Sequence, residues 1–184
     1  MITAMAFSAA LTPAALSGRG LAEVNLRNPK RKTLRRVHVP GAVYFVTATP
    51  RRREAILVGD RAGVALQAFE RLHAESRARV LAFVVMPDHV HALLSPPPQC
   101  RIGGAIKFFK RVASNQIWRS GHVGRVWEAR FCYRVIRDRA ELIAAVEYIH
   151  ANPVRNGLSE QSTGWPWSTA ACIDRWDLDS VEPS

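Results

Sequence analysis

Two short apolar stretches joined by a two-residue turn constrain the fold of this chain most strongly. Residues 80–86 are apolar without interruption, Pro87 and Asp88 favour a turn, and residues 89–94 carry histidine at alternate positions. This pattern predicts an antiparallel β-hairpin whose strands are too short to cross a membrane. The strand that carries the histidines is therefore expected to pair with an apolar strand.

The second strand of the hairpin brings two imidazole groups to one face. Because side chains alternate across a strand, His89 and His91 project to the same side, and Val90 and Ala92 to the other. Residues two apart on a strand are separated by about 6–7 Å at Cα. Two ring nitrogens at about 2.1 Å from a shared ion can bridge that span. The pair is a candidate metal site, although two ordinary strand histidines are the commoner explanation of an isolated pair.

The charge balance favours a polyanionic partner. The chain of 184 residues has 26 lysines and arginines against 15 aspartates and glutamates, a net charge of +11. With an isoelectric point near 10.7, nucleic acid is the leading candidate. The sequence has no apolar run of about 18 residues, and its cysteines lack zinc-knuckle or disulfide spacing. We therefore expect a cytoplasmic, nucleoid-associated protein and no membrane partner.

The length fits one domain with a tail on either side. We expect residues 1–36 to form a flexible basic arm, residues 37–170 the domain and residues 171–184 a C-terminal tail. The arm ends in a basic cluster that includes Arg35 and Arg36. These side chains either contact phosphates or are solvated tail charges.

The domain has the pattern of an α+β fold. Besides the hairpin, the predicted elements are strands over residues 42–49 and 131–136 and helices over residues 60–76, 102–118 and 139–151. Asp138 and Glu141 form a capping box at the start of the last helix. This order predicts a ferredoxin-like antiparallel sheet with helices on one face and an added C-terminal helix.

The added helix carries a tyrosine and an asparagine on one side. Leu142, Val146 and Ile149 form its predicted apolar stripe. Tyr148 lies about 120° from that stripe, and Asn152, four residues later, shares its side. We therefore place both residues on a face outside the core, which for an arbitrary helix most often means a solvent-facing pair.

The hairpin and the helix together resemble a known family. Residues 86–91 (Met-Pro-Asp-His-Val-His) and residues 148–158, which begin Tyr-Ile-His-Ala-Asn-Pro, are similar to the single-tyrosine HUH transposases. The similarity is greatest to the branch of REP-associated tyrosine transposases. It extends from Val39 to Thr169 and includes Trp127. Either motif alone is weak or moderate, and their joint presence makes the resemblance specific.

The resemblance implies a site and a reaction. His89 and His91 would hold a divalent ion, Mg²⁺ or Mn²⁺, and Asn152 would complete the site. Tyr148 would be the nucleophile of a metal-dependent strand transferase, attacking single-stranded DNA to leave a 5′-phosphotyrosine and a free 3′-OH. A phenol has a reference pKa of about 10, so at neutral pH it is a weak nucleophile that needs the help of a metal ion. The implied partner is single-stranded or hairpin DNA, bound by a homodimer or a monomer.

Several assignments stay open at this stage. Tyr133 is a rival nucleophile, whereas Tyr44 lies in an apolar strand and is expected in the core. Asp88 either orients a histidine or shapes the turn. Glu141 and His150 are further candidates for groups that support the site.

Basic and aromatic residues are candidates for contacts with DNA. The predicted phosphate contacts are Arg35, Arg36, Arg51, Arg52, Arg53, Lys107, Lys110 and Arg111, with Arg130 and Arg134 as further candidates. Each could equally be a solvated surface charge. Trp127, Trp165 and Trp167 either stack on unpaired bases or pack in the core.

The main alternative function is a DNA-binding protein that keeps the fold without turnover. An RNA-binding module of similar fold ranks lower, because no aromatic-rich strand motif of the kind that stacks RNA bases is present. A zinc hydrolase also ranks lower, because no His-Glu-x-x-His helix is present.

Overall fold

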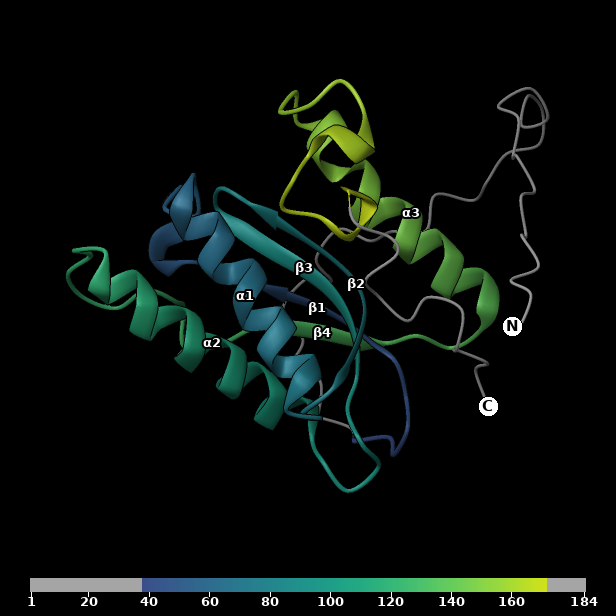
Figure 1. The fold of residues 1–184 in the computed structure, drawn as a ribbon. Helices are drawn as coiled ribbons and strands as arrows, with labels where there is room; N and C mark the ends of the chain where they lie inside the picture. Colours follow the sequence, from purple (N-terminus) through teal and green to yellow (C-terminus); the bar gives the residue numbers. More distant parts are fainter. Residues whose placement is uncertain (1–37, 172–184) are drawn as a thin grey trace, which may run out of the picture.

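The computed structural model describes residues 38–171 (Figure 1). The expected basic arm, with Arg35 and Arg36, and the tail from residue 172 lie outside this range. The strands are β1 (Tyr44–Ala48), β2 (Arg79–Met86), β3 (His89–Ser95) and β4 (Cys132–Val135). The helices are α1 (Asp60–Ala74), α2 (Ile102–Arg119) and α3 (Arg139–Arg155), with short 3₁₀ turns η2 (Arg51–Arg53), η3 (Ser162–Gly164) and η4 (Thr169–Ala171).

The strands form one antiparallel sheet in the order β2-β3-β1-β4. Helices α1 and α2 cover one face of this sheet, and α3 lies against the other (Figure 1). The prediction of a ferredoxin-like α+β fold with an added C-terminal helix is therefore confirmed. No helix within the described range combines the length and apolarity that a membrane crossing requires.

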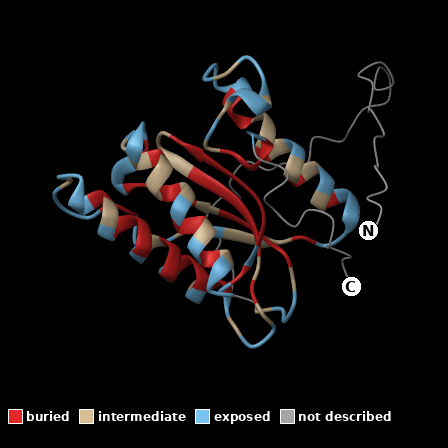
Figure 2. Cartoon of the chain, viewed as in Figure 1, coloured by how far each residue is buried: buried red, intermediate tan, exposed pale blue. Residues whose placement is uncertain are grey.

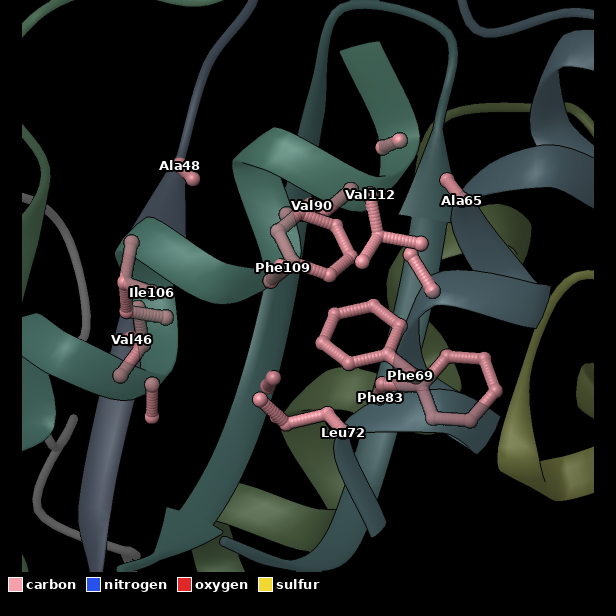
Figure 3. Packing of buried hydrophobic residues seen from close by; sticks show 14 of the residues in the cluster. Val46, Ala48, Ala65, Phe69, Leu72, Phe83, Val90, Ile106, Phe109 and Val112 are labelled. Atoms are coloured by element: carbon pink, nitrogen blue, oxygen red, sulfur yellow. The ribbon is translucent and has the colours of Figure 1, made fainter. Parts of the chain in front are cut away.

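The larger core lies between the sheet and the α1–α2 layer. The ring of Phe69 stacks on Phe83 of β2, with centroids 4.7 Å apart, and on Phe109 of α2, 4.3 Å apart (Figure 3). Burial of such large side chains is the main stabilising term in a domain of this size. The rings join both helices to the sheet, so the opposite face of the sheet is held rigid.

Strand β2 is buried on both faces, which explains its uninterrupted apolar sequence (Figure 2). Val80, Phe83 and Val85 belong to the larger core, whereas Val84 and Met86 belong to the smaller core against α3. A strand covered on two sides cannot alternate apolar and polar residues. The hairpin signal in the sequence therefore reflects the presence of a third layer.

The side of α3 that faces the sheet differs from the prediction. Its buried residues are Glu141, Ala145, Ile149, Asn152 and Pro153. The predicted stripe residues Leu142 and Val146 are only partly buried, and Tyr148 packs against the smaller core rather than outside it. The predicted stripe does face the smaller core, but the placement of Tyr148 and Asn152 outside the core was wrong. The same side buries Glu141, a carboxylate paired with Arg134 of β4, a partner that helical periodicity does not reveal.

Helix α3 also runs past its predicted end. The capping box is present, since the Glu141 amide donates to Asp138 Oδ1 at 2.8 Å. The helix then continues through Pro153 to Arg155. Proline removes one N–H, but the Asn156 amide donates to the Asn152 carbonyl at 3.1 Å and keeps the last turn helical.

Residues 165–170 run along the outer edge of β2. The Val85 amide donates to the Trp167 carbonyl at 2.8 Å, and the Trp165 indole N–H donates to the Val85 carbonyl at 2.9 Å. Trp167 packs against the larger core. Since Trp127 is buried as well, these tryptophans have packing roles, the alternative to base stacking that the sequence left open.

Candidate active site

An open cleft of about 720 Å³ lies beside α3 on the face of the sheet opposite α1 and α2. Its walls come from β1, β3, β4 and the end of α3. His89, His91, Tyr148 and Asn152 all line it. The fold thus brings together the four residues that the sequence motifs single out.

Each of the two histidines has a hydrogen-bond partner at its Nδ1 atom. Their ring centroids are 4.6 Å apart, on the same face of β3 as predicted. His89 Nδ1 donates to Asp88 Oδ1 at 2.6 Å, and His91 Nδ1 lies 2.9 Å from the Thr47 hydroxyl. Engagement of Nδ1 leaves Nε2 of each ring as the coordinating nitrogen, the arrangement typical of metal-ligating histidines.

Burial favours the neutral form of the second histidine. Burial, together with the smaller effects of the His89 and Arg53 charges, lowers the pKa of His91 to about 3. Neutral imidazole is the form that binds metals. A metal bound at His91 would therefore displace no proton from this ring near neutral pH.

Thr47 is a site residue that the sequence did not indicate. It lies directly opposite His91 in the pairing of β1 with β3. The strand pattern over residues 42–49 gives the face of Thr47 but not its register. To predict the contact of Thr47 with His91, the pairing register of two strands far apart in the sequence would have to be known.

Asn152 supplies an oxygen donor. Its side chain is 5% exposed, and its Nδ2 donates to the Tyr148 carbonyl at 2.9 Å. Its Oδ1 is the atom left for a ligand role. Two imidazole nitrogens and one amide oxygen form a softer donor set than the all-oxygen set that Mg²⁺ prefers. Such a set would suit Mn²⁺ well. Within residues 38–171 no cluster of three His, Cys, Asp or Glu side chains has metal-site geometry.

Tyr148 lies next to the histidines despite its distance in sequence. Its half-buried ring is 5.5 Å from the His91 ring and 5.9 Å from Phe45, centroid to centroid. Tyr133 borders the cleft, but its ring packs 5.7 Å from buried Tyr44 on the α1–α2 side of the sheet. Tyr148 is therefore the tyrosine whose ring meets the histidines.

Only some of the residues predicted to contact DNA lie at the cleft. Arg53 lines the cleft, but Arg51 and Arg52 of the same turn do not. Exposed Lys107 and Arg111 project from α2, in the layer across the sheet. The remaining helix lysine, Lys110, donates to the Glu128 and Arg130 carbonyls at 2.8 and 3.1 Å, so it holds the loop beside the cleft.

Three more arginines line the cleft: Arg130, Arg134 and Arg155. Arg155 was not among the predicted contacts, and it lies beyond the predicted end of the helix at residue 151. Arg134 pairs with Glu141, which also accepts from the Arg137 amide at 2.8 Å. Glu141 therefore anchors the start of α3 rather than supporting the histidines.

His150 lies outside the cleft. Its Nε2 is 2.9 Å from the Thr169 hydroxyl, so it links α3 to the segment along β2. Burial lowers its pKa and favours the neutral ring. Its place is structural.

Comparisons with known proteins agree with this geometry. Residues 38–152 match the family model described as transposase IS200 like. The chain is 27% identical over 137 residues to the REP-associated tyrosine transposase of Escherichia coli (strain K12), covering 73% of this chain and 80% of the relative. It is 30% identical over 107 residues to the ISDra2 transposase TnpA of Deinococcus radiodurans, covering 53% of this chain and 76% of the relative.

A solved structure shares the fold. It is described as the REP-associated tyrosine transposase bound to a REP hairpin, with a TM-score of 0.67 and 24% sequence identity, and covers 83% of this chain and 93% of that chain. The family match spans most of the described residues and includes both histidines, Tyr148 and Asn152. The resemblance predicted from the sequence motifs is confirmed: this chain belongs to the IS200-like transposase family, with REP-associated tyrosine transposases among its relatives.

Proposed function

We propose that this transposase-family protein cleaves and transfers single-stranded DNA through a covalent link to Tyr148, with the help of a divalent cation. The single observation that carries the proposal is the 5.5 Å contact between the rings of Tyr148 and His91. It brings a phenol next to a pair of imidazoles whose Nε2 atoms are left for coordination. A noncatalytic surface has no need of this combination.

Each residue has a distinct role in the proposed reaction. The Tyr148 Oη attacks a phosphodiester, the new O–P bond forms, and the P–O3′ bond breaks. The phenol proton passes to solvent, and the departing 3′ oxygen takes up a proton. No water is consumed, so the phosphotyrosine keeps the energy of the bond and a 3′-OH can later reverse the step.

The cation would be Mn²⁺ or Mg²⁺ held by His89, His91 and Asn152, and when bound it would polarise the phosphate oxygen. The protein prepares this site in advance. Asp88 and Thr47 fix the ring orientations, and the buried neutral His91 is ready to coordinate. These are the features that support the assignment of the donor set.

The proposed substrate is hairpin DNA with a single-stranded flank. The strongly basic chain fits a polyanion, and a relative of the same fold is described as bound to a REP hairpin. A cleft open on one side fits a flexible single strand better than a duplex. The protein is proposed to act as a monomer or a homodimer.

The test uses labelled hairpins with flanks on both sides, taken from repeats near the gene, incubated with Mn²⁺ and analysed on denaturing gels. Wild type is expected to form a covalent adduct, and Tyr148→Phe is expected to form none. Tyr133→Phe is the matched control and should retain the adduct. Loss of the adduct in Tyr133→Phe alone would refute the nucleophile assignment. Tight hairpin binding without any adduct would favour the alternative function, a noncatalytic DNA-binding protein.

A further inference from the structure

The arginines of the cleft differ in their partners. They are Arg53, Arg130, Arg134 and Arg155. Arg53 Nε lies 3.5 Å from Asp88 Oδ2, and Arg134 is paired with Glu141. Arg155, like Arg130, forms no ion pair with a carboxylate of the described range. Its positive charge is therefore available to a ligand.

Arg155 lies beside the tyrosine. Its guanidinium carbon is 5.6 Å from the centroid of the Tyr148 ring, over the ring face. The residue is two helical turns beyond Tyr148 on α3. Among the cleft arginines, Arg155 is the one whose guanidinium lies over the Tyr148 ring, whereas that of Arg134 lies over Phe45.

The end of α3 holds this arrangement in place. Asn156 Nδ2 donates to the Asn152 carbonyl at 2.8 Å, and the Leu158 amide donates to the Pro153 carbonyl at 2.9 Å. These bonds satisfy carbonyls of the last turn. A cation in that turn is also favoured by the helix dipole. Arg155 therefore starts from a fixed backbone, although its side chain is exposed.

We propose that Arg155 is a catalytic residue that binds a non-bridging oxygen of the phosphodiester attacked by Tyr148. This inference rests on the proposed function and adds a residue to it. A guanidinium presents a planar fork of N–H donors that matches two phosphate oxygens. Placed over the phenol ring, it is near the phosphate that the phenolic oxygen must approach. The phosphate would then lie between Arg155 on one side and the histidine pair on the other.

The first experiment separates chemistry from binding. Single-turnover rates of adduct formation and hairpin affinities are measured for wild type, Arg155→Ala and Arg155→Lys. Arg139→Ala, an exposed arginine at the other end of α3, is the matched control. Arg155→Ala is expected to slow adduct formation by about 100-fold, with hairpin affinity changed by less than about 10-fold. Arg155→Lys should recover part of the rate because it keeps the charge without the fork.

The second experiment asks whether the scissile phosphate is the partner. A methylphosphonate at the cleavage position replaces one charged oxygen with a methyl group. If Arg155 binds such an oxygen, the Arg155→Ala defect should shrink on this substrate compared with the ordinary phosphodiester. An equal defect on both substrates, or a wild-type rate in Arg155→Ala, would overturn the proposal.

The third experiment does not depend on turnover. Binding of an unstructured single strand is measured in EDTA at several salt concentrations. Loss of one phosphate contact should reduce the slope of log affinity against log salt by about 0.7 in Arg155→Ala, and Arg139→Ala should keep the wild-type slope. If wild type forms no adduct, the proposed function fails, while this slope still tests the phosphate contact. An unchanged slope in Arg155→Ala would refute that contact.

Discussion

The hydroxyl of Thr47 lies 2.9 Å from Nδ1 of His91, directly across the β1–β3 pairing. A residue of one strand therefore sets the orientation of the imidazole on the next. Since the ring is buried, it has little freedom to find another partner. The hydroxyl thus supports one histidine of the candidate metal site through the ring nitrogen Nδ1.

Thr47→Val should weaken metal binding while leaving the fold intact. The substitution keeps the shape of the side chain but removes the acceptor that fixes the His91 tautomer. Loss of such a supporting group typically costs about 10- to 100-fold in metal affinity. Titration of the protein with Mn²⁺ alone measures the effect, and Thr47→Ser, which retains the hydroxyl, is the control. Equal affinity in Thr47→Val would show that the bond has no orienting role.

Asp88→Asn tests whether Asp88 orients His89 or only shapes the turn. Asparagine is a good turn residue, so the free energy of unfolding should change by less than about 0.5 kcal/mol. The charge facing His89 Nδ1 is lost, however, and Mn²⁺ affinity should fall by about 10-fold. Asp88→Gly also fits a turn and should show a similar loss of affinity. Wild-type Mn²⁺ binding in both variants would assign Asp88 to the turn alone.

Glu141→Gln should destabilise the domain. Glu141 is 8% exposed and faces the partly buried Arg134, so removal of its charge leaves that guanidinium without its anionic partner. Because Arg134 is partly solvated, the expected cost is about 1–2 kcal/mol in free energy of unfolding, measurable by urea denaturation. Glu147→Gln, an exposed glutamate of the same helix, should have little effect. A small change in Glu141→Gln would mean that the ion pair does not anchor α3.

The stability of the domain should rise with pH in the alkaline range because of Lys110. Burial lowers the pKa of Lys110 to about 8, against an ordinary value of 10.5, and the charge of Glu128 only partly opposes this shift. Between those values the unfolded chain binds more protons at this group than the folded domain does. The free energy of unfolding therefore increases as pH rises through this window.

Lys110→Met keeps the aliphatic stem and removes the titrating group, so this part of the rise should disappear. Urea denaturation at about pH 8 and about pH 10 measures it. Lys107→Met, at an exposed lysine of the same helix, should show the wild-type rise. Parallel curves for the two variants would contradict the assignment.

Local sequence patterns predict local geometry well in this chain. Alternation places His89 and His91 on one face, and the helical spacing of Tyr148 and Asn152 puts them on one side of α3, which is how the structure has them. Both relationships depend only on the regular repeat of one element. The same holds for the capping box at Asp138.

Contacts between different strands and helices could not be predicted from the sequence patterns in the same way. The register of β1 against β3, which puts Thr47 opposite His91, depends on pairing across a long stretch of chain. The burial of Glu141 on α3 goes with its pairing to Arg134 on β4, a contact between distant parts of the sequence. Arg155 was not among the predicted contacts, and bonds beyond Pro153 continue α3 past its predicted end at residue 151.

The segment along the edge of β2 has a consequence for association between molecules. An uncovered edge strand presents unpaired N–H and C=O groups that can recruit a strand from another molecule. Here the Trp165 and Trp167 contacts to Val85 occupy that edge. A chain that ends before Trp165 would expose the edge of β2, an apolar strand. Intermolecular β-sheet pairing at this edge would then compete with correct folding. The last described residues therefore cover this edge of the sheet and also link it to α3 through the contact of Thr169 with His150.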